Sequence, residues 1–505
     1  MFTKLLVANR GEIACRIIRG ARELGVATVA VHSEADRLSP HVLLADEAVE
    51  VGPAPSAESY LRIDRLLEAA KATGADAVHP GYGFLAERAP VAHAVEDAGL
   101  IFVGPTAGTI QAMGDKTEAR RRMQEAGVPI VPGIVDAAET AEAARDAAAG
   151  IGYPVLLKAA AGGGGKGMRV VESEDALERA FDAARREAQA AFGDGSVYVE
   201  KYLGRPRHVE IQVLGDAHGN VVHLAERECS IQRRHQKLVE EAPSPVLSPE
   251  ERSAMGEAAV RAARAVDYRG AGTVEFLYQD GEFFFLEMNT RLQVEHPVTE
   301  LVTGLDLVHW QLRVAAGEPL DFGQEDVTLT GHAVECRITS EDPARGFLPS
   351  TGVVRHLALP QGPGVRWDGG IAEGFEVGLH YDPLLGKLVV HAPDRATAMA
   401  RLRRALDELV VDGVDTCIDL HRRIAREPDF LRGELSIRYL EEHPELLDAG
   451  TDPAGRRAAA VAAALLAERE RNGVGTARLD EEGDGAVAGG RRLSTWRSRG
   501  WPWND

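Results

Sequence analysis

Polar side chains alternate along residues 287–295, directly after the apolar run at residues 283–286. The alternating residues are Glu287, Asn289, Arg291, Gln293 and Glu295. In an extended chain, every second residue lies on the same face. A solvated strand can alternate in the same way, but carboxylates, amides and a guanidinium together suit a site that handles a metal, an oxyanion and a proton. A straight strand would spread these groups over about 26 Å, so we expect a bend after Asn289.

The residues before this face predict a β-hairpin, because Asp280-Gly281 separates two apolar runs. A strict two-residue turn would pair Glu275 with Leu286 and would place Glu275 and Glu287 on opposite faces. If both carboxylates bind one metal, the hairpin must contain a β-bulge or an extra loop residue. Magnesium takes one or two protein carboxylates together with substrate phosphates. Glu275, Glu287 and Asn289 therefore fit a nucleotide-bound Mg²⁺ better than a dedicated metal cage.

A run of glycines at residues 162–165 lies between two predicted strands and is framed by Lys158 and Lys166. It differs from a P-loop, because Gly167 stands where Ser or Thr is required and because a strand follows instead of a helix. Consecutive glycines between strands predict a hairpin whose amide groups can close over phosphates. A plain flexible linker is the alternative interpretation.

The first hundred residues predict a parallel α/β sheet. Leu5–Ala8 and Ala27–Val31 have the composition of buried strands, and Glu12–Leu24 has the spacing of an amphipathic helix. The turn between strand and helix lacks the GxGxxG pattern, which argues against a dinucleotide site. Two later loops, at residues 79–87 and 104–105, follow predicted strands. They are interpreted equally well as ligand-facing loops or as tight turns.

Length and composition favour a protein of several packed domains. The chain has 505 residues, of which 45% are hydrophobic, and length alone suggests about three domains. No apolar run approaches the roughly 20 residues that span a bilayer, and no secretory signal begins the chain, so we expect a cytoplasmic protein without membrane contact. The formal charge of −21 argues against nucleic-acid binding. The cysteines lie far apart in sequence and are expected in the core, without disulfides or a zinc site.

Several longer motifs, in order along the chain, resemble those of the biotin carboxylase family. They are Ala8–Ile13, His79–Glu87, Met113–Lys116, the glycine run, Glu226–Lys237 and Glu287–Pro297. The resemblance implies an ATP-grasp fold of mixed α/β and α+β class. It implies an N-terminal parallel α/β domain at 1–115, an ATP-grasp domain at 116–330 with a lid near 131–204, and a C-terminal biotin carboxylase domain at 331–447. Residues 448–505 would be a helical or linker extension.

The resemblance also implies roles for individual residues. The residues implied to bind ATP are Lys116, Lys158, Gly164, Gly165, Glu200, Lys201, Leu203, His208, Gln232, His235, Glu275 and Glu287. The residues implied to bind Mg²⁺ or Mn²⁺ are Glu275, Glu287 and Asn289. Bicarbonate would be held by Lys237, Arg291, Gln293 and the Val294 backbone, with Glu295 as its base. Arg337 would stabilise the enolate of biotin.

The implied reaction begins when Glu295 removes a proton from bicarbonate as bicarbonate attacks the γ-phosphoryl group of ATP. The product, carboxyphosphate, must be shielded from water, and a glycine lid can provide that shield. Carboxyphosphate then gives CO₂ and phosphate, and phosphate removes the N1′ proton of biotin while Arg337 stabilises the enolate oxygen. The catalytic residues would thus be Glu295, Arg291, Arg337 and Lys237, acting in the first half-reaction of an acyl-CoA carboxylase.

No methionine in the chain is followed by lysine, so we expect biotin to arrive in trans on a biotin carboxyl carrier protein. A carboxyltransferase subunit would be a second partner. A homodimer through the first and third domains is expected from the resemblance, with Arg16 on the exposed side of the first helix as a possible contact. Residues 456–471 predict an Ala-rich helix, and the Trp- and Arg-rich tail at 491–503 resembles the connector of multidomain acyl-CoA carboxylase subunits. A natural free subunit and a truncated one both fit this tail.

Two other functions share some of these residues. Another ATP-grasp ligase, forming carbamoyl phosphate or an amide, would share the lid and the metal carboxylates but would not need Arg337. A catalytically silent assembly subunit would be expected to lack Glu295, Lys237 or Arg291, and all three are present.

Overall fold

Short strands alternate with helices at the start of the chain and form the predicted parallel sheet. Its strands, in spatial order, are β3 (Glu47–Gly52), β2 (Ala27–Ser33), β1 (Lys4–Val7), β4 (Ala77–His79) and β5 (Ile101–Phe102). Helix α1 (Gly11–Glu23) connects β1 to β2 and completes the βαβ unit. The other helices of this region are α2 (Pro40–Leu44), α3 (Ile63–Thr73), α4 (Ala89–Asp97) and α5 (Ala107–Gly114).

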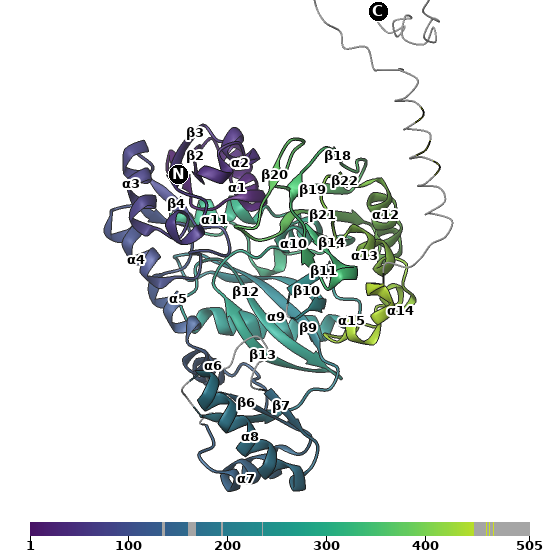
Figure 1. Cartoon of the computed structure of the whole chain (residues 1–505). Helices are drawn as coiled ribbons and strands as arrows, with labels where there is room; N and C mark the ends of the chain where they lie inside the picture. The colour runs from purple at the N-terminus through teal and green to yellow at the C-terminus, as the bar shows by residue number, and fades with distance from the viewer. Residues whose placement is uncertain are drawn as a thin grey trace, which may run out of the picture. The chain divides into compact units, whose positions relative to one another are not determined.

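The computed structural model describes residues 1–133, 137–159, 168–192, 195–234 and 236–448, and beyond these only Val461, Ala464 and Glu468. Residues 1–449 form one unit and residues 450–505 another (Figure 1). The helix predicted at 456–471 is described at those last three residues alone, and each of them is helical. The tail at 491–503 lies outside the described residues.

One expectation about α1 is wrong. Arg16 does not lie on an exposed face, because only 7% of it is accessible to solvent. Its guanidinium contacts Glu300 Oε1 at 2.8 Å and Asp306 Oδ2 at 2.7 Å. Asp306 is the N-cap of α11 (Leu307–Ala315), and Glu300 accepts from the first N–H of that helix, which packs against α1. The apolar spacing of α1 predicted its inner face correctly but could not show that a second element covers Arg16.

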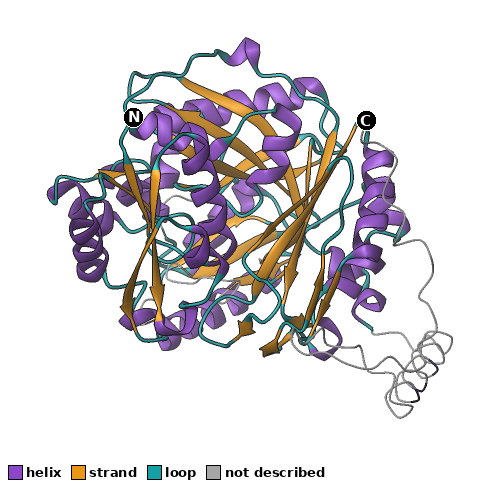
Figure 2. Ribbon diagram, turned by 90° about the horizontal axis from the view of Figure 1, so that it is seen from above, coloured by secondary structure: helices purple, strands orange, loops and turns teal. Residues whose placement is uncertain are grey.

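The centre of the first unit is an antiparallel sheet of eight strands. In spatial order they are β13 (Glu282–Asn289), β12 (Gly270–Gln279), β9 (Arg207–Gly215), β10 (Val221–Arg233), β11 (Gln236–Ala242), β14 (His332–Thr339), β21 (Leu384–Ala392) and β19 (Val365–Gly369). Helix α9 (Pro249–Arg264) packs on β9 and β10, and α10 (His296–Thr303) lies against β10, β11 and β14. Figure 2 shows helices against the faces of the strands.

Strand β9 shows how the sheet separates core from site. Val209, Ile211 and Val213 belong to the apolar core that includes α9. The intervening residues His208, Glu210 and Gln212 are also buried but are polar. Because alternate residues of a strand face opposite sides, these three polar side chains are directed together to the other face of the sheet.

The hairpin of β12 and β13 contains the bulge that two facing carboxylates require. Gln279 pairs with Glu282 across a turn in which Asp280 and Gly281 have φ values of 54° and 86°. The register shifts between Glu275 and Phe276, so that Glu275 pairs with Glu287. Leu286 is the extra residue of the bulge. The predicted bend after Asn289 is also present, since β13 ends there and α10 begins at His296.

A smaller three-stranded antiparallel sheet lies between α6 (Lys116–Glu125) and β9 in sequence. It contains β7 (Met168–Val171), β6 (Val155–Ala159) and β8 (Val197–Lys201), with α7 (Ala141–Ile151) and α8 (Glu174–Phe192) packed on it. The predicted order of strand, glycine run and strand is therefore confirmed. The run itself, with Gly164 and Gly165, lies outside the described residues. Figure 1 shows this subdomain at one end of the first unit.

The last part of the first unit packs around β14 and β21. Helix α12 (Arg395–Glu408) covers these strands, followed by α13 (Ile418–Ile424), α14 (Pro428–Arg432) and α15 (Tyr439–Glu442). Short strand pairs complete the region: β15 (Glu341–Asp342) with β16 (Leu348–Pro349), β17 (Gly352–Val353) with β20 (Glu376–Val377), and β18 (His356–Ala358) with β22 (Val410–Asp412). All four cysteines are buried and free, as expected. Within the described residues, no helix has both the length and the apolar character needed to cross a membrane.

Candidate active site

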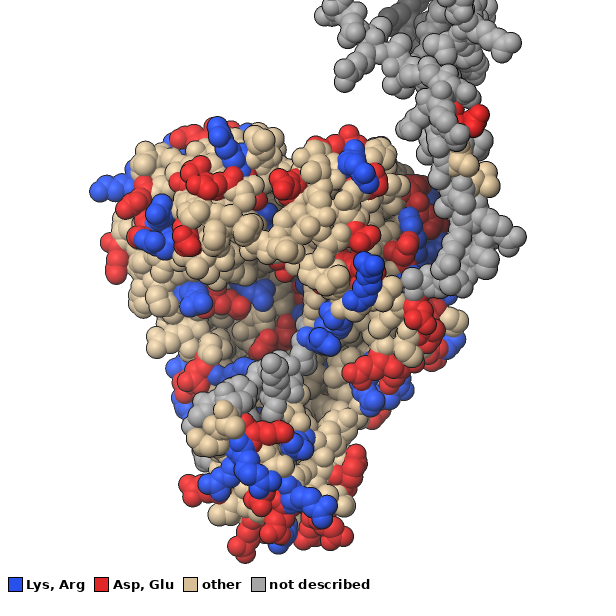
Figure 3. All heavy atoms as spheres, in the orientation of Figure 1, with Lys and Arg blue, Asp and Glu red and all other residues tan. Residues whose placement is uncertain are grey.

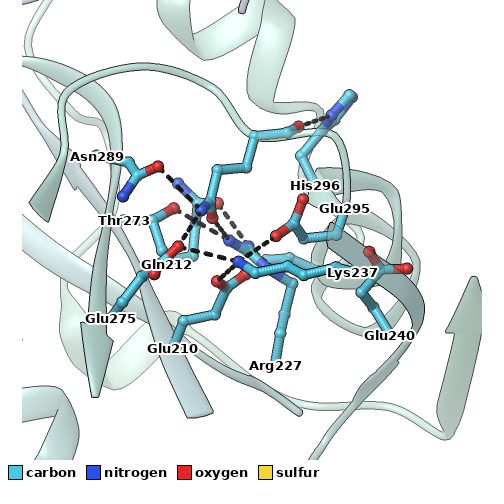
Figure 4. Close-up of polar contacts among 12 residues, drawn as sticks. Glu210, Gln212, Arg227, Lys237, Glu240, Thr273, Glu275, Asn289, Glu295 and His296 are labelled. Atoms are coloured by element: carbon cyan, nitrogen blue, oxygen red, sulfur yellow. Dashed lines mark hydrogen bonds and ion pairs between the residues drawn. The ribbon is translucent and has the colours of Figure 1, made fainter. Parts of the chain in front are cut away.

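Lys237, on β11, lies at the centre of a buried charge cluster (Figure 4). Its Nζ donates to Glu210 Oε2 at 2.6 Å, to Glu275 Oε1 at 2.9 Å and to Glu295 Oε1 at 2.7 Å. Burial alone would lower the pKa of Lys237, but the three carboxylates raise it well above its ordinary value. The ammonium is therefore fixed in its charged form, with negative charge in excess around it.

Glu295 lies directly before α10 and is contacted by two cations. Lys237 donates to one carboxylate oxygen, and Arg337 Nη2 donates to the other at 2.8 Å. Burial opposes ionisation of Glu295, but Lys237 and Arg337, with a smaller effect of Arg227, hold its pKa well below the usual value. Glu295 is therefore a carboxylate in this arrangement. The sheet brings it to Arg337 across 42 residues of sequence.

Arg337, on β14, is held from two sides. Its Nε donates to Glu240 Oε1 at 2.6 Å, and its Nη2 donates to Glu295. Glu240 lies on the neighbouring strand β11 and is fully buried. Glu240 therefore fixes the guanidinium even when the Glu295 contact changes. Nothing local in the sequence distinguishes Glu240 from the adjacent Glu241, so Glu240 was not predicted as a site residue.

The bend after β13 carries the predicted residues Arg291 and Gln293 into the site. Arg291 donates to Asn289 Oδ1 at 2.6 Å and to Glu87 Oε2 at 2.9 Å. Gln293 donates through Nε2 to Glu275 Oε1 at 2.8 Å. Glu87 also accepts from the backbone N–H of Thr290 at 3.0 Å. The loop at residues 79–87 thus reaches the site with its last residue, in keeping with the interpretation of it as a ligand-facing loop.

Arg227, on β10, was missed as an individual residue although it lies inside a quoted motif. It is fully buried and connects three strands and α10. Its side-chain acceptors are Glu210 Oε1 at 2.5 Å, Gln293 Oε1 at 2.6 Å, Gln212 Oε1 at 2.7 Å, Thr273 Oγ1 at 3.0 Å and Thr299 Oγ1 at 3.0 Å. Because Gln293 accepts through Oε1, its amide nitrogen must face Glu275. The alternating polar residues of β9 offered a sequence signal for it. Glu210 and Gln212 carry acceptor oxygens on a buried strand and therefore require a buried donor such as Arg227.

The paired carboxylates of Glu275 and Glu287 fit a divalent cation. Partial loss of hydration raises the pKa of Glu287, the charge of Glu275 raises it further, and Lys116 lowers it. A cation between the two carboxylates would relieve this repulsion, and Asn289 offers an amide oxygen on the same strand. Ligand atoms of His208, Glu210 and Glu275 also lie within 4.8 Å of one another. The donor set is mostly oxygen, which suits Mg²⁺ or Mn²⁺.

Figure 3 shows a hollow in this face of the molecule. The residues assigned to the nucleotide come from α6, from the small three-stranded sheet and from the central sheet. Glu200 is buried and contacts both Lys158 of β6 and Arg120 of α6. Burial opposes ionisation of Glu200, while Lys158 and Arg120 lower its pKa. Lys116 begins α6 and is exposed near Glu287.

The remaining nucleotide assignments separate into two groups. Gln232 and His208 are buried on β10 and β9, on the central sheet. Lys201 and Leu203 are half-buried at the end of β8 and just beyond it. His235 lies outside the described residues, as do Gly164 and Gly165. Their expected contacts with ATP stay predictions.

An antiparallel sheet with paired acidic residues on its edge hairpin, joined to a small three-stranded subdomain with a lysine on its central strand, is the arrangement of an ATP-grasp enzyme. The chain belongs, within that class, to the biotin carboxylase family. Residues 1–110 match the biotin carboxylase N-terminal domain, and residues 335–442 match the biotin carboxylase C-terminal domain. Residues 115–322 match the ATP-binding domain of the carbamoyl-phosphate synthase L chain.

Individual relatives agree with this membership. The chain is 55% identical over 447 residues to a biotin carboxylase of Haemophilus influenzae, covering 88% of this chain and 99% of the relative. It is 47% identical over 497 residues to the mitochondrial methylcrotonoyl-CoA carboxylase subunit alpha of Mus musculus, covering 97% of this chain and 69% of the relative. The chain is thus an ATP-grasp ligase, which carboxylates biotin with ATP and bicarbonate.

A solved structure has the same fold. It is the biotin carboxylase domain dimer of the Hydrogenobacter thermophilus 2-oxoglutarate carboxylase, crystallised with MgADP, ADP and bicarbonate. The TM-score is 0.81 at 48% identity, and the match covers 89% of this chain and 99% of that one.

Proposed function

We propose that Lys237, Arg291, Gln293 and the Val294 backbone bind bicarbonate and that Glu295 removes its proton. The observation that supports this most directly is the contact of Glu295 with both Lys237 and Arg337 in a buried cluster. The positive charge of Lys237 now lowers the pKa of Glu295. An anion bound to Lys237 would offset part of that charge. The pKa of Glu295 would then rise towards that of a usable base.

The second part of the proposal concerns ATP. Glu275, Glu287 and Asn289 would hold Mg²⁺, which supplies charge stabilisation to the phosphates when it is bound. Lys116 and Lys158 would bind phosphate oxygens, since the charge of Lys116 at the start of α6 already acts on Glu287 and Lys158 of β6 offers a second cation. Lys158 would exchange its contact with Glu200 for one with the nucleotide. Lys201 and Leu203 would contact the adenine from the end of β8, and His208 and Gln232 from the central sheet.

The third part concerns biotin. Arg337 would stabilise the biotin enolate, because its guanidinium is a permanent cation that Glu240 holds in place. Carboxyphosphate would form beside it and be shielded from water by closure of the lid. The domain boundaries expected from the sequence, including the lid at 131–204, stay part of this proposal.

The partners of the chain are also proposed. A biotin carboxyl carrier protein would act in trans, and a carboxyltransferase subunit would receive the carboxyl group in the cytoplasm. The mouse relative supports an acyl-CoA carboxylase context, because its similarity extends over 97% of this chain. The dimer of the Hydrogenobacter domain supports a homodimer. Light scattering at micromolar concentration should give twice the chain mass, and a monomer would remove the dimer from the proposal.

The test of the function is ADP release with each component omitted in turn. Release should need Mg²⁺ and bicarbonate and should increase with free biotin, with carboxybiotin as the product. Undiminished ADP release in bicarbonate-free buffer would contradict the assignment. Ammonia-dependent formation of carbamoyl phosphate would instead support the other ATP-grasp ligase.

A further inference from the structure

The carbonyls of Gln293 and Val294 each contact a buried side chain that is not among the residues proposed to bind bicarbonate. His296 Nδ1 lies 2.8 Å from the carbonyl oxygen of Gln293, and Lys387 Nζ donates to the carbonyl oxygen of Val294 at 2.8 Å. Both side chains are fully buried. Figure 4 shows the contact between the His296 ring and this loop. The backbone on both sides of Val294 is therefore tied from outside the charge cluster.

The His296 ring, together with a longer bond of 3.4 Å from the His296 backbone N–H to the same carbonyl, orients the Val294 amide. A peptide group is planar and trans, so the Val294 N–H is antiparallel to the Gln293 carbonyl and is directed away from His296. Val294 is half-buried, and its N–H has no acceptor within the described part of the chain. A half-buried amide that makes no hydrogen bond within the protein is free to donate to a ligand. The flanking side chains of Gln293 and Glu295 reach Glu275 and Lys237, which place the segment at the cluster.

The hydrogen of the His296 ring must lie on Nδ1, because a carbonyl oxygen only accepts hydrogen bonds. Burial lowers the pKa of His296 well below its usual value, and the nearby cations Lys387, Arg16 and Arg366 lower it further. The ring is therefore neutral. Its Nε2 has no hydrogen-bond partner among the described residues. A histidine used only for packing would not require its one donor to face this carbonyl.

Lys387 acts on the following peptide. It comes from β21 and also contacts Glu12 Oε2 of α1 at 3.2 Å. Its bond to the Val294 carbonyl directs the Glu295 N–H away from Lys387 by the same peptide geometry. The segment Gln293–Glu295 is thus held by β21 and by its own helix, and Glu12 of α1 in turn holds Lys387.

We propose that His296 is a positioning residue for bicarbonate, which holds the Val294 N–H towards the anion by fixing the Gln293 carbonyl. This rests on the bicarbonate site proposed above. Three variants separate the role from simple packing. His296→Asn keeps a donor at the position of Nδ1, His296→Gln moves the donor to the position of Nε2, and His296→Leu has no donor. Steady-state ADP release is measured against bicarbonate and, separately, against ATP.

The KM for bicarbonate should increase about tenfold in His296→Gln and His296→Leu, the effect of losing roughly one hydrogen bond to the anion. It should stay within about threefold of the parent in His296→Asn, and the KM for ATP should change less than about twofold throughout. Equal bicarbonate KM values in the Asn and Gln variants would overturn the proposal. So would a parallel increase for ATP.

Folding is checked by thermal unfolding and by binding of MgADP, which does not need bicarbonate. If His296→Leu fails to fold, the comparison of Asn with Gln decides. If Asn and Gln also fail to fold, His296 is a structural residue and the proposal is wrong. A parent enzyme without bicarbonate-dependent ADP release would instead refute the proposed function, and the two failures are therefore distinguishable.

Discussion

At the scale of single residues, the site is organised by excess negative charge around a few buried cations. Lys237 and Arg337 share Glu295, and Arg227 fixes the side chains on the other side of the cluster. Removing one member of a buried charge cluster leaves its partners uncompensated, which costs more than the pair itself contributes. Substitutions that keep shape and hydrogen bonding are therefore the informative ones.

Glu295→Gln should lower turnover by roughly two to four orders of magnitude, the range for loss of a general base. MgADP affinity should stay near that of the parent, because the proposed nucleotide contacts lie on other residues. Single-turnover ADP release and calorimetric titration with MgADP measure the two quantities. A glutamine variant with parental turnover would show that another group accepts the proton.

Arg337→Ala should reduce carboxylation of biotin more than it reduces bicarbonate-dependent ATP cleavage. The reason is that its proposed partner is the biotin enolate, whereas bicarbonate has other cations available. The ratio of carboxybiotin to ADP measures this division directly. Equal losses in both assays would contradict it, and Arg404→Ala is a suitable control, because Arg404 pairs with Glu408 on the exposed side of α12.

At the scale of elements, the eight-stranded sheet and its bulge position the site residues. A separate cluster of side chains connects the N-terminal parallel sheet to the C-terminal region. The guanidinium of Arg10 lies 4.2 Å from the ring centroid of Tyr381 and contacts Asp36 Oδ2 at 2.6 Å. Tyr60 donates to the same carboxylate at 2.5 Å. Tyr381 in turn donates to the carbonyl of Ala54 at 2.6 Å. This cluster joins the parallel sheet to the loop between β20 and β21.

Asp36→Asn should lower the free energy of unfolding by about 2 kcal/mol at pH 7. Burial opposes ionisation of Asp36, but Arg10 and Tyr60 lower its pKa to about 2. Because the folded pKa is below the unfolded one, the contribution is complete above the unfolded value near 4 and is lost as pH falls towards 2. Urea unfolding at pH 7 and pH 5 should give the same difference from the parent.

A matched control for that experiment is Asp64→Asn. Asp64 also pairs with an arginine, Arg62, but both side chains are exposed. Exposed ion pairs contribute little to stability, so its unfolding midpoint should stay close to that of the parent. Equal destabilisation by the two variants would show that burial of Asp36 is not the cause.

At the scale of the whole molecule, residues 450–505 form a second unit whose sequence is unlike the first. Its tail contains Trp496, Trp501 and Trp503 among several arginines. Tryptophan and arginine are enriched at interface hot spots. Removing residues 473–505 should leave carboxylation of free biotin intact while weakening assembly with the carrier or carboxyltransferase subunit. Native affinity of the shortened chain for its partner, measured by calorimetry, would exclude a docking role.

The sequence by itself determined the local features of this protein. Alternation predicted the shared face at residues 287–295, the need to bring Glu275 and Glu287 together predicted the bulge, and apolar spacing predicted the βαβ unit. These succeeded because a strand or helix period is a property of a few consecutive residues. The motif series also determined the family. The roles assigned to single residues from that resemblance stay predictions.

Only the tertiary structure decided which side chains from distant segments meet. Arg227, Glu240 and Lys387 act across strands and regions, and no pattern within their own strands shows which residues they contact. The same reason explains the error at Arg16, whose burial depends on α11 almost 300 residues later in the chain. Long-range contacts depend on how whole elements pack, and packing is decided by the complete set of apolar faces and not by the spacing within one of them.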